Sequence, residues 1–243
     1  MTVLSPASAP PTHPSELTLT DIRDHTGANR DGPAFLVVLD ADSTLIRDEV
    51  IELLADAAGS RTRVAEITDQ AMNGEIDFAH SLRERVLTLA GLPTSVFAEV
   101  GRLIRPTPGV HELIDGLHAA GARVGVVSGG FHELLDPLAS VLHLDHWRAN
   151  RLEVRDDRLT GFVTGPIIDA AAKAAALREW AAAENVPLTR TVAVGDGAND
   201  LEMMAVAGLA VAFNAKPRVK READVVVDVC DLSQVLPLLG LRG

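Results

Sequence analysis

Three short, largely apolar runs, each followed directly by polar residues, constrain the fold of this chain more than any other feature. The runs cover residues 34–39, 123–127 and 191–194. Continuous apolar runs of this length are typical of strands buried on both faces of a parallel sheet. Strand and helix patterns alternate along the later part of the chain, as in parallel α/β proteins. We therefore expect an α/β fold with a doubly wound parallel sheet.

The remaining apolar pattern divides the chain into a leader, a core and a helical insert. Residues 1–31 are rich in Pro, Ser and Thr without sustained periodicity, which predicts a flexible leader. Residues 48–105 repeat apolar side chains at three-and-four spacing, and no strand-like run interrupts them. We therefore predict a core domain of residues 32–47 and 106–243, with a small helical cap, 48–105, inserted after the first strand.

Several local elements are also expected. Thr107 and Pro108 predict the N-cap and first residue of a helix that ends at Gly121. The polarity switch after Val127 predicts that the second strand ends there. The remaining expected elements are helices at 131–142 and 170–184, a hairpin at 149–163 around Asp156-Asp157, and strands at 209–212 and 224–227.

Composition and charge exclude several classes of partner. The chain has 34 acidic and 22 basic residues, a formal charge of -12, which disfavours nucleic acid and anionic membrane surfaces. Aromatic residues make up 3% with no Tyr, so stacking platforms for single strands are scarce. The single Cys230 suits a reducing compartment, and the sequence carries no signal-like or bilayer-length apolar segment. We expect a cytoplasmic protein that binds neither nucleic acid nor membrane.

Acidic residues gather where the predicted strands end. Asp40 and Asp42 follow the first strand, and Asp196 and Asp200 follow the third. Because the carboxyl ends of parallel strands share one sheet edge, four carboxylates would converge there with no cation among them. Such a cluster favours Mg²⁺, which takes hard oxygen ligands and pairs with substrate phosphate. The alternative is that each Asp is a strand-end turn residue or a helix N-cap.

These residues also carry a resemblance to a known family. The resembling segments are Asp40-x-Asp42-x-Thr44, Ser128-Gly129-Gly130, Lys173 and Gly195-Asp196-Gly197-x-Asn199-Asp200. In this order they resemble the four motifs of the haloacid dehalogenase-like phosphatases. The longer strings DSTLIRDE, FAHSLRERV, VVSGGF, ANRLEV followed by RLTG, and TVAVGDGANDLEMM are similar to those of the phosphoserine phosphatases over residues 34–238. The resemblance implies the Rossmann-like core of that superfamily.

The resemblance implies roles for the acidic residues. Asp40 would be the nucleophile that forms an aspartyl-phosphate, a step for which a carboxylate is chemically competent. Asp42 would protonate the leaving oxygen and then take a proton from the attacking water. Mg²⁺ would bind the Asp40 carboxylate, the Asp42 backbone carbonyl and Asp196, with Asp200 orienting metal-bound water.

The phosphoryl oxygens need stabilising groups of their own. The resemblance assigns this task to the Ser128 hydroxyl, the backbone N–H of Gly129 and Lys173. A lysine in an Ala-rich helix is more often exposed to solvent. The alternative is therefore that Lys173 is a solvated surface residue.

The helical insert would supply substrate choice. By resemblance Arg85 clamps a substrate carboxylate, Glu49 takes an ammonium group, Met72 and Phe78 line the pocket, and Asn199 touches the substrate side. Simpler readings exist: Arg85 as a surface helix charge, Glu49 as a first-turn acid, and Met72 and Phe78 as core residues.

The resemblance implies Mg²⁺-dependent hydrolysis of O-phospho-L-serine, the last step of L-serine biosynthesis in this family, by an enzyme with a small-molecule substrate and a possible homodimeric state. One alternative is a phosphatase or phosphotransferase of the same fold acting on another small phosphomonoester, such as a phosphohomoserine- or phosphocholine-type compound. Another is a receiver domain or a non-catalytic phospholigand-binding protein. A receiver, however, needs neither a general acid two residues past its phosphorylated Asp nor a cap.

Overall fold

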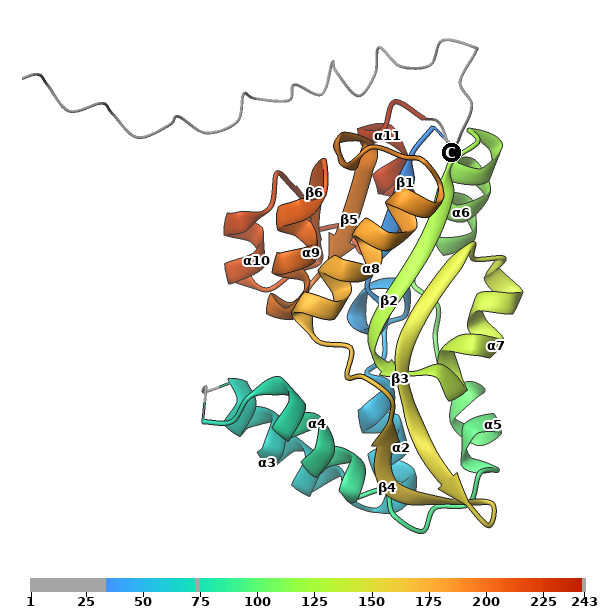
Figure 1. Ribbon diagram of the computed structural model, residues 1–243, viewed down its shortest axis with the longest axis vertical. Coiled ribbons are helices and arrows are strands. Elements are labelled where there is room, and N and C mark those ends of the chain that lie inside the picture. The colour runs from blue at the N-terminus through green and yellow to red at the C-terminus, as the bar shows by residue number, and fades with distance from the viewer. Residues whose placement is uncertain (1–33, 73–74, 242–243) are drawn as a thin grey trace, which may run out of the picture.

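The computed structural model describes residues 34–72 and 75–241 and contains a seven-stranded sheet with the order β4-β3-β2-β1-β5-β6-β7 (Figure 1). The strands are β1 (Leu36–Leu39), β2 (Arg123–Phe131), β3 (His146–Arg155), β4 (Arg158–Thr164), β5 (Thr191–Gly195), β6 (Leu209–Phe213) and β7 (Val225–Val227). All neighbouring pairs are parallel except β3 with β4. The predicted leader, 1–31, lies outside the described residues.

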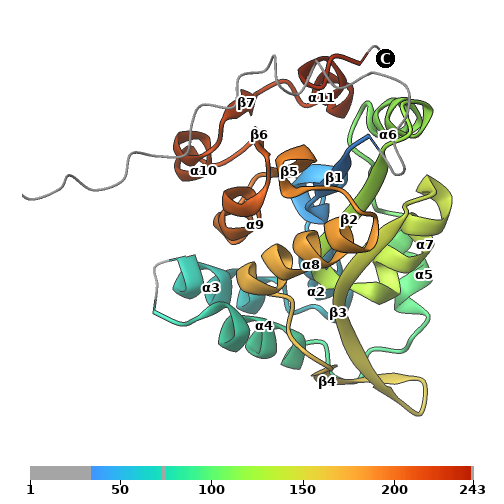
Figure 2. The same cartoon turned by 45° about the horizontal axis from the view of Figure 1, so that its top comes forward.

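Helices cover both faces of this sheet. The α-helices are α2 (Val50–Ala58), α3 (Arg61–Met72), α4 (Phe78–Leu87), α5 (Val96–Gly101), α6 (Val110–Ala119), α7 (His132–Leu142), α8 (Ala170–Ala183), α9 (Leu201–Val206), α10 (Pro217–Glu222) and α11 (Val235–Leu238). The helices α6, α7 and α11 lie on one face and α8, α9 and α10 on the other (Figure 2). Their buried apolar side chains form one hydrophobic cluster on each face. The predicted doubly wound α/β fold is confirmed. None of the described helices has the length and apolarity needed to cross a membrane.

The second strand differs from its prediction. β2 does not end at Val127 but continues through the polar cluster to Phe131. Its register with β3 shifts in this stretch, because Val127 pairs with Arg148 whereas Phe131 pairs with Asn150. The segment 128–130 therefore forms a bulge inside the strand, which is why a polarity switch misplaced the strand's end.

The start of helix α6 also differs. The helix begins at Val110 after Gly109, whose φ of 75° lies in the left-handed region that glycine tolerates best. Thr107 is not the N-cap, because its hydroxyl donates a hydrogen bond to the carbonyl of Thr44 at 2.7 Å. The Thr107 side chain, which the local pattern predicted to cap the helix, is bonded instead to the backbone of a residue far away in the sequence.

The helices α2 to α5 lie beyond the carboxyl edge of the sheet and share a hydrophobic cluster with the β3–β4 hairpin (Figure 1). Leu152 and Leu159 of the hairpin belong to the same buried cluster as Leu82 of α4. The hairpin turns at Asp156 and Asp157, both with positive φ, as their sequence predicted. The cap boundaries, 48–105, stay a prediction, and the hairpin provides part of the surface on which these helices pack.

Two chain segments connect these helices to the sheet, and they run side by side. Ile46 forms an antiparallel bridge with Pro106, and the N–H of Arg47 donates to the carbonyl of Arg105 at 2.9 Å. Asp48, only 8% exposed, accepts from the backbone N–H of Arg105 at 2.7 Å and from its Nη2 at 2.6 Å. This ion pair joins the outgoing segment to the returning one.

The Asp48–Arg105 pair predicts a pH-dependent contribution to stability. Burial raises the pKa of Asp48, but hydrogen bonds from Arg105 outweigh it and hold that pKa below its usual 3.8. The stabilisation is therefore complete above the pKa that Asp48 has in the unfolded chain, and it is lost as the pH falls through the lower pKa that Asp48 has in the folded protein. We expect Asp48→Asn to lower the melting temperature by a few degrees at neutral pH, and to approach the wild type as pH falls below about 3.8. Thermal melts across pH, with exposed Asp69→Asn as control, would measure this, and a pH-independent deficit would contradict it.

Candidate active site

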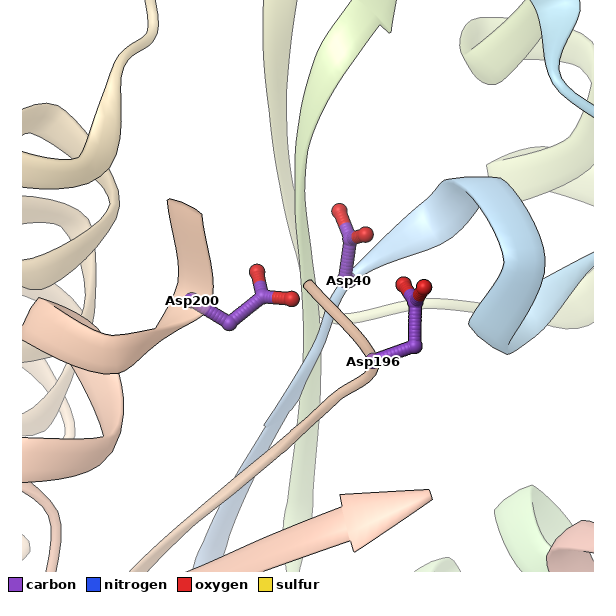
Figure 3. A group of neighbouring side chains, drawn as sticks. All are labelled: Asp40, Asp196 and Asp200. Atoms are coloured by element: carbon purple, nitrogen blue, oxygen red, sulfur yellow. The ribbon is translucent and has the colours of Figure 1, made fainter. Parts of the chain in front are cut away.

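Three carboxylates meet at the carboxyl edge of the sheet. Asp40 follows β1, and its N–H donates to the carbonyl of Val194 in β5 at 2.9 Å. Asp196 follows β5, and Asp200 ends the short 3₁₀-helix Ala198–Asp200. One carboxylate oxygen from each Asp lies within 4.8 Å of the others, and all three residues are buried (Figure 3). Three of the four carboxylates that were expected to converge at this edge are thus brought together by the parallel strand order.

A lysine lies within this cluster. Lys173 Nζ of α8 donates to Asp40 Oδ1 at 2.5 Å and to Asp200 Oδ1 at 2.7 Å, and its side chain is 0% exposed. The expectation of a cluster without a cation is wrong, and so is the reading of Lys173 as a solvated residue. The physical reason is that α8 packs across β1 and β2 and brings in a residue 133 positions from Asp40.

The electrostatics of the cluster favour an additional positive charge. Burial raises the pKa of Asp40 to about 8, the charge of Asp200 adds to the rise, and Lys173 opposes it. Burial, and then Asp200, raise the pKa of Asp196 to about 6, against the attraction of Lys216. Full ionisation of the three carboxyls is therefore unfavourable in the metal-free fold, even with Lys173 beside Asp40 and Asp200. Their number, spacing and hard oxygen donors fit a divalent metal ion.

Asp42 lies beside the cluster rather than in it. The chain turns sharply after β1 over Ala41–Leu45, where Ser43 takes a positive φ of 58°. Asp42 Oδ1 is buried without a hydrogen-bond partner among the described residues. Burial, together with the charges of Glu49 and Asp40, raises the pKa of Asp42 well above its usual value. A carboxyl in this environment holds its proton and can donate it to a leaving group.

The bulge of β2 faces the same turn. The N–H of Gly130 donates to Ser128 Oγ at 2.8 Å, and Ser128 is 2% exposed. A Cβ added to Gly130 would lie 2.7 Å from Val50 Cγ2 and 3.0 Å from Ser128 Oγ, so a larger residue would have to displace these side chains, and Asp42 Oδ2 lies 3.4 Å from the same position. Because its oxygen already accepts, the Ser128 hydroxyl keeps its hydrogen for donation to a bound anion.

The helices α2 and α4 bring charged and aromatic groups to this edge. Ser43 Oγ donates to Glu49 Oε1 at 2.8 Å, and the Glu49 side chain makes no capping bond to α2. Arg85 is half-buried; burial lowers its pKa, while the carboxylates of Glu49 and Asp42 raise it. Phe78 Cζ lies 3.1 Å from the position of a Cβ on Gly129 and also packs on the cap cluster. The Nε of Arg85 donates to the carbonyl of Ser81 in its own helix at 3.2 Å. Its role as a carboxylate clamp stays a prediction, and the acids whose charge acts on it are Glu49 and Asp42.

Two predicted pocket residues are less defined. Asn199 lies half-buried in the turn before Asp200, with its Oδ1 close to the backbone of Gly197. Met72 is the last residue of α3, and its side chain lies outside the described part of the structure. Their contacts with substrate stay predictions.

Comparison with known proteins places this site in a family. The model of the haloacid dehalogenase-like hydrolases matches residues 37–205, more than half of the chain and all the site residues described above. The chain belongs to the haloacid dehalogenase-like hydrolases. This confirms the resemblance inferred from the motifs.

Within this family the chain is similar to several phosphoserine phosphatases. The chain is 49% identical over 208 residues to the phosphoserine phosphatase of Streptococcus thermophilus, with 86% of this chain and 97% of that one covered. It is 56% identical over 206 residues to that of Streptomyces coelicolor, which covers 85% of this chain but only 50% of the relative. The chain thus spans about half the length of that relative.

A solved structure shows the same fold. The phospho-aspartyl intermediate analogue of a phosphoserine phosphatase superposes with a TM-score of 0.79 at 42% identity and covers 84% of this chain and 97% of that chain. By its name, that structure represents an analogue of a phospho-aspartyl intermediate in the related phosphatase.

Sequence reasoning missed two residues near the site. Lys216 is exposed at the N-terminus of α10, and its N–H donates to the carbonyl of Asp196 at 3.0 Å. Asn150 of β3 is 1% exposed and hydrogen-bonded to the bulge of β2. The Pro217 that follows Lys216 signals a helix start. Asn150 lies in the string ANRLEV that carries part of the resemblance, but no role was assigned to it, because no local pattern indicates its tertiary contact.

Proposed function

We propose that this chain hydrolyses O-phospho-L-serine to L-serine and inorganic phosphate through an aspartyl-phosphate on Asp40, with Mg²⁺ as cofactor. The observation that carries this proposal is the hydrogen bond from Ser43 Oγ to Glu49 Oε1 at 2.8 Å, which holds an acid from the start of α2 on the turn that follows Asp40 and contains Asp42. The charges of Glu49 and Asp42 also act on the half-buried Arg85 of α4. An amino-acid phosphate needs this combination of partners beside a nucleophile and a proton donor.

The residues support a two-step reaction. A carboxylate oxygen of Asp40 attacks phosphorus while the bond from phosphorus to the serine oxygen breaks, and Asp42 gives its proton to that oxygen. Asp42 then takes a proton from a water that attacks the aspartyl-phosphate, which releases phosphate and restores the Asp40 carboxylate. The Ser128 hydroxyl, the Gly129 N–H and Lys173 would hold the phosphoryl oxygens in both steps.

The acidic cluster would hold the cofactor. Asp40, the backbone carbonyl of Asp42 and Asp196 are the proposed Mg²⁺ ligands, with Asp200 behind them. When bound, Mg²⁺ supplies positive charge that offsets the carboxylates and the phosphoryl oxygens. The clustered carboxylate oxygens, and pKa values that are raised when no cation offsets their charge, support a divalent ion. Activity in Mg²⁺ and its loss in EDTA would test this.

Substrate selection follows from the cap side of the site. We infer that Arg85 binds the substrate carboxylate and Glu49 its ammonium group, with Met72, Phe78 and Asn199 around them. Absence of nucleic-acid and membrane binding, a cytoplasmic location and a homodimeric state stay predictions, and the last is checked by the mass of the particle in solution.

The test is phosphate release from a panel of phosphomonoesters: L-phosphoserine, L-phosphothreonine, phosphoethanolamine, phosphocholine and a sugar phosphate. We expect L-phosphoserine to be preferred, with Asp40→Asn as the blank. Preference for another ester would keep the catalytic residues and replace the substrate, while transfer to an added alcohol such as homoserine would indicate a phosphotransferase. No turnover of any ester would favour a non-catalytic phospholigand-binding protein.

Arg85→Ala gives the sharpest test of the pocket. We expect kcat/KM for L-phosphoserine to fall on the order of 10²-fold, because a charge-assisted pair to the substrate carboxylate is lost. Phosphoethanolamine lacks that carboxylate, so its kcat/KM should change by less than about threefold. The matched control is Arg83→Ala, an exposed arginine of the same helix. Equal losses for both esters would show that Arg85 does not read the carboxylate.

A further inference from the structure

The bulge in β2 leaves backbone groups without partners in the sheet. Four residue steps of β2, from Val127 to Phe131, lie opposite two steps of β3, from Arg148 to Asn150. Buried peptide groups in such a stretch need hydrogen bonds from outside the strand ladder. The N–H of Ala149 finds one at 3.1 Å from His132 Nε2. Side chains therefore complete this part of the sheet.

Asn150 provides the partner on the other side of the bulge. Its Nδ2 donates to the carbonyl of Gly129 at 2.8 Å, and its Oδ1 accepts from the N–H of Ile168 at 2.9 Å. The carbonyl can only accept and the N–H can only donate, so the two partners determine the orientation of the amide. Both hydrogen-bonding ends of a side chain that is 1% exposed are used.

These two bonds reach two parts of the proposed phosphate site. The carbonyl of Gly129 and the N–H of Gly130 belong to one planar peptide, and that N–H donates to Ser128 Oγ. Asn150 thus holds one end of the peptide whose other end orients the Ser128 hydroxyl. Ile168 precedes Asp169, the N-cap of α8, which carries Lys173. One amide therefore connects the segment of Ser128 to the segment that leads into Lys173.

We propose that Asn150 is a positioning residue for phosphate binding: it orients the Gly129–Gly130 peptide, and through it Ser128, relative to the start of α8. The inference rests on the proposed function, because it takes Ser128 and Lys173 as phosphoryl-binding groups. Asn150 itself touches neither substrate nor metal ligands in this account. Asparagine suits the position because a carboxylate would offer no donor to the Gly129 carbonyl and an apolar side chain would satisfy neither partner.

The experiment compares Asn150→Leu and Asn150→Asp with the wild-type chain in Mg²⁺. Turnover of p-nitrophenyl phosphate and inhibition by orthophosphate are measured, so the comparison does not depend on phosphoserine being the substrate. We expect kcat to fall on the order of 10- to 100-fold and the inhibition constant of orthophosphate to rise about tenfold, as displaced oxyanion donors do elsewhere. Asn150→Asp keeps an acceptor for Ile168 and the side-chain volume, so it provides a folded variant if Asn150→Leu does not accumulate.

Leu236→Ala is the control for stability alone. Leu236 is fully buried in α11, in the cluster on the opposite face of the sheet from α8. We expect this variant to lose melting temperature while its kcat and orthophosphate inhibition stay at wild-type values. Asn150 variants that lose stability but keep both kinetic values would overturn the inference. Wild-type kinetics in Asn150→Asp alone would overturn the role of the bond to Gly129.

Discussion

Replacing Lys173 by methionine is expected to lower the free energy of unfolding by about 3–5 kcal/mol and to abolish turnover. The ammonium group has no exposure and contacts Asp40 and Asp200 at 2.5 and 2.7 Å. Without it, the carboxylate of Asp200 would retain the N–H of Gly197 at 3.0 Å as its hydrogen-bond donor while facing two further acids. Removing one partner of a buried ion pair leaves an uncompensated charge, and this is the source of the large effect.

Denaturant unfolding in EDTA measures the loss, and a double-mutant cycle identifies its cause. Asp200→Asn added to Lys173→Met should recover part of the stability, because it removes the carboxylate left without its cation. Lys216→Met, which removes an exposed lysine near Asp196, is the control and should cost less than about 0.5 kcal/mol. A loss below about 1 kcal/mol for Lys173→Met would show that the three acids are not balanced by this lysine.

Asp40→Asn is expected to reduce turnover by at least about 10⁴-fold, because an amide cannot act as the phosphoryl acceptor. Its effect on stability should change with pH. In the absence of metal, burial and then Asp200 raise the pKa of Asp40 from 3.8 to about 8. The folded state therefore holds a proton that the unfolded state releases, and wild-type stability falls as pH rises between these two values.

The Asn variant lacks this titration. We expect its free energy of unfolding in EDTA, relative to wild type, to increase from pH about 4 to pH about 8 and then to level off. Loss of the partner of Lys173 adds an offset, so the slope rather than the absolute difference is the measurement. Asp69→Asn, an exposed acid of α3, serves as the control for activity. A difference that stays flat over this range would show that Asp40 is not raised in the metal-free fold.

Much of the fold follows from local pattern. Valine-rich runs predicted β1, β2 and β5 because strands buried on both faces need apolar side chains at every position. Asp156 and Asp157 predicted the hairpin turn because Asp tolerates positive φ. Convergence of the acids followed from chain direction alone, since parallel strands place their carboxyl ends at one edge.

Contacts between distant segments account for what local pattern missed. Thr107 bonds to Thr44 instead of capping a helix, and Lys173 enters the acidic cluster because α8 packs on the strands that end there.

The sequence by itself determined the doubly wound sheet, the order of the motif residues and the acidic edge, because burial, periodicity and strand direction act within short segments. Only the tertiary structure decided which cation balances the acids, where the bulge of β2 lies and how Asn150 joins two phosphate-binding segments. These depend on side chains meeting across 21, 18 and 133 residues of chain. Such contacts depend on how the helices and strands pack in the whole fold, so a pattern within a short segment does not predict them.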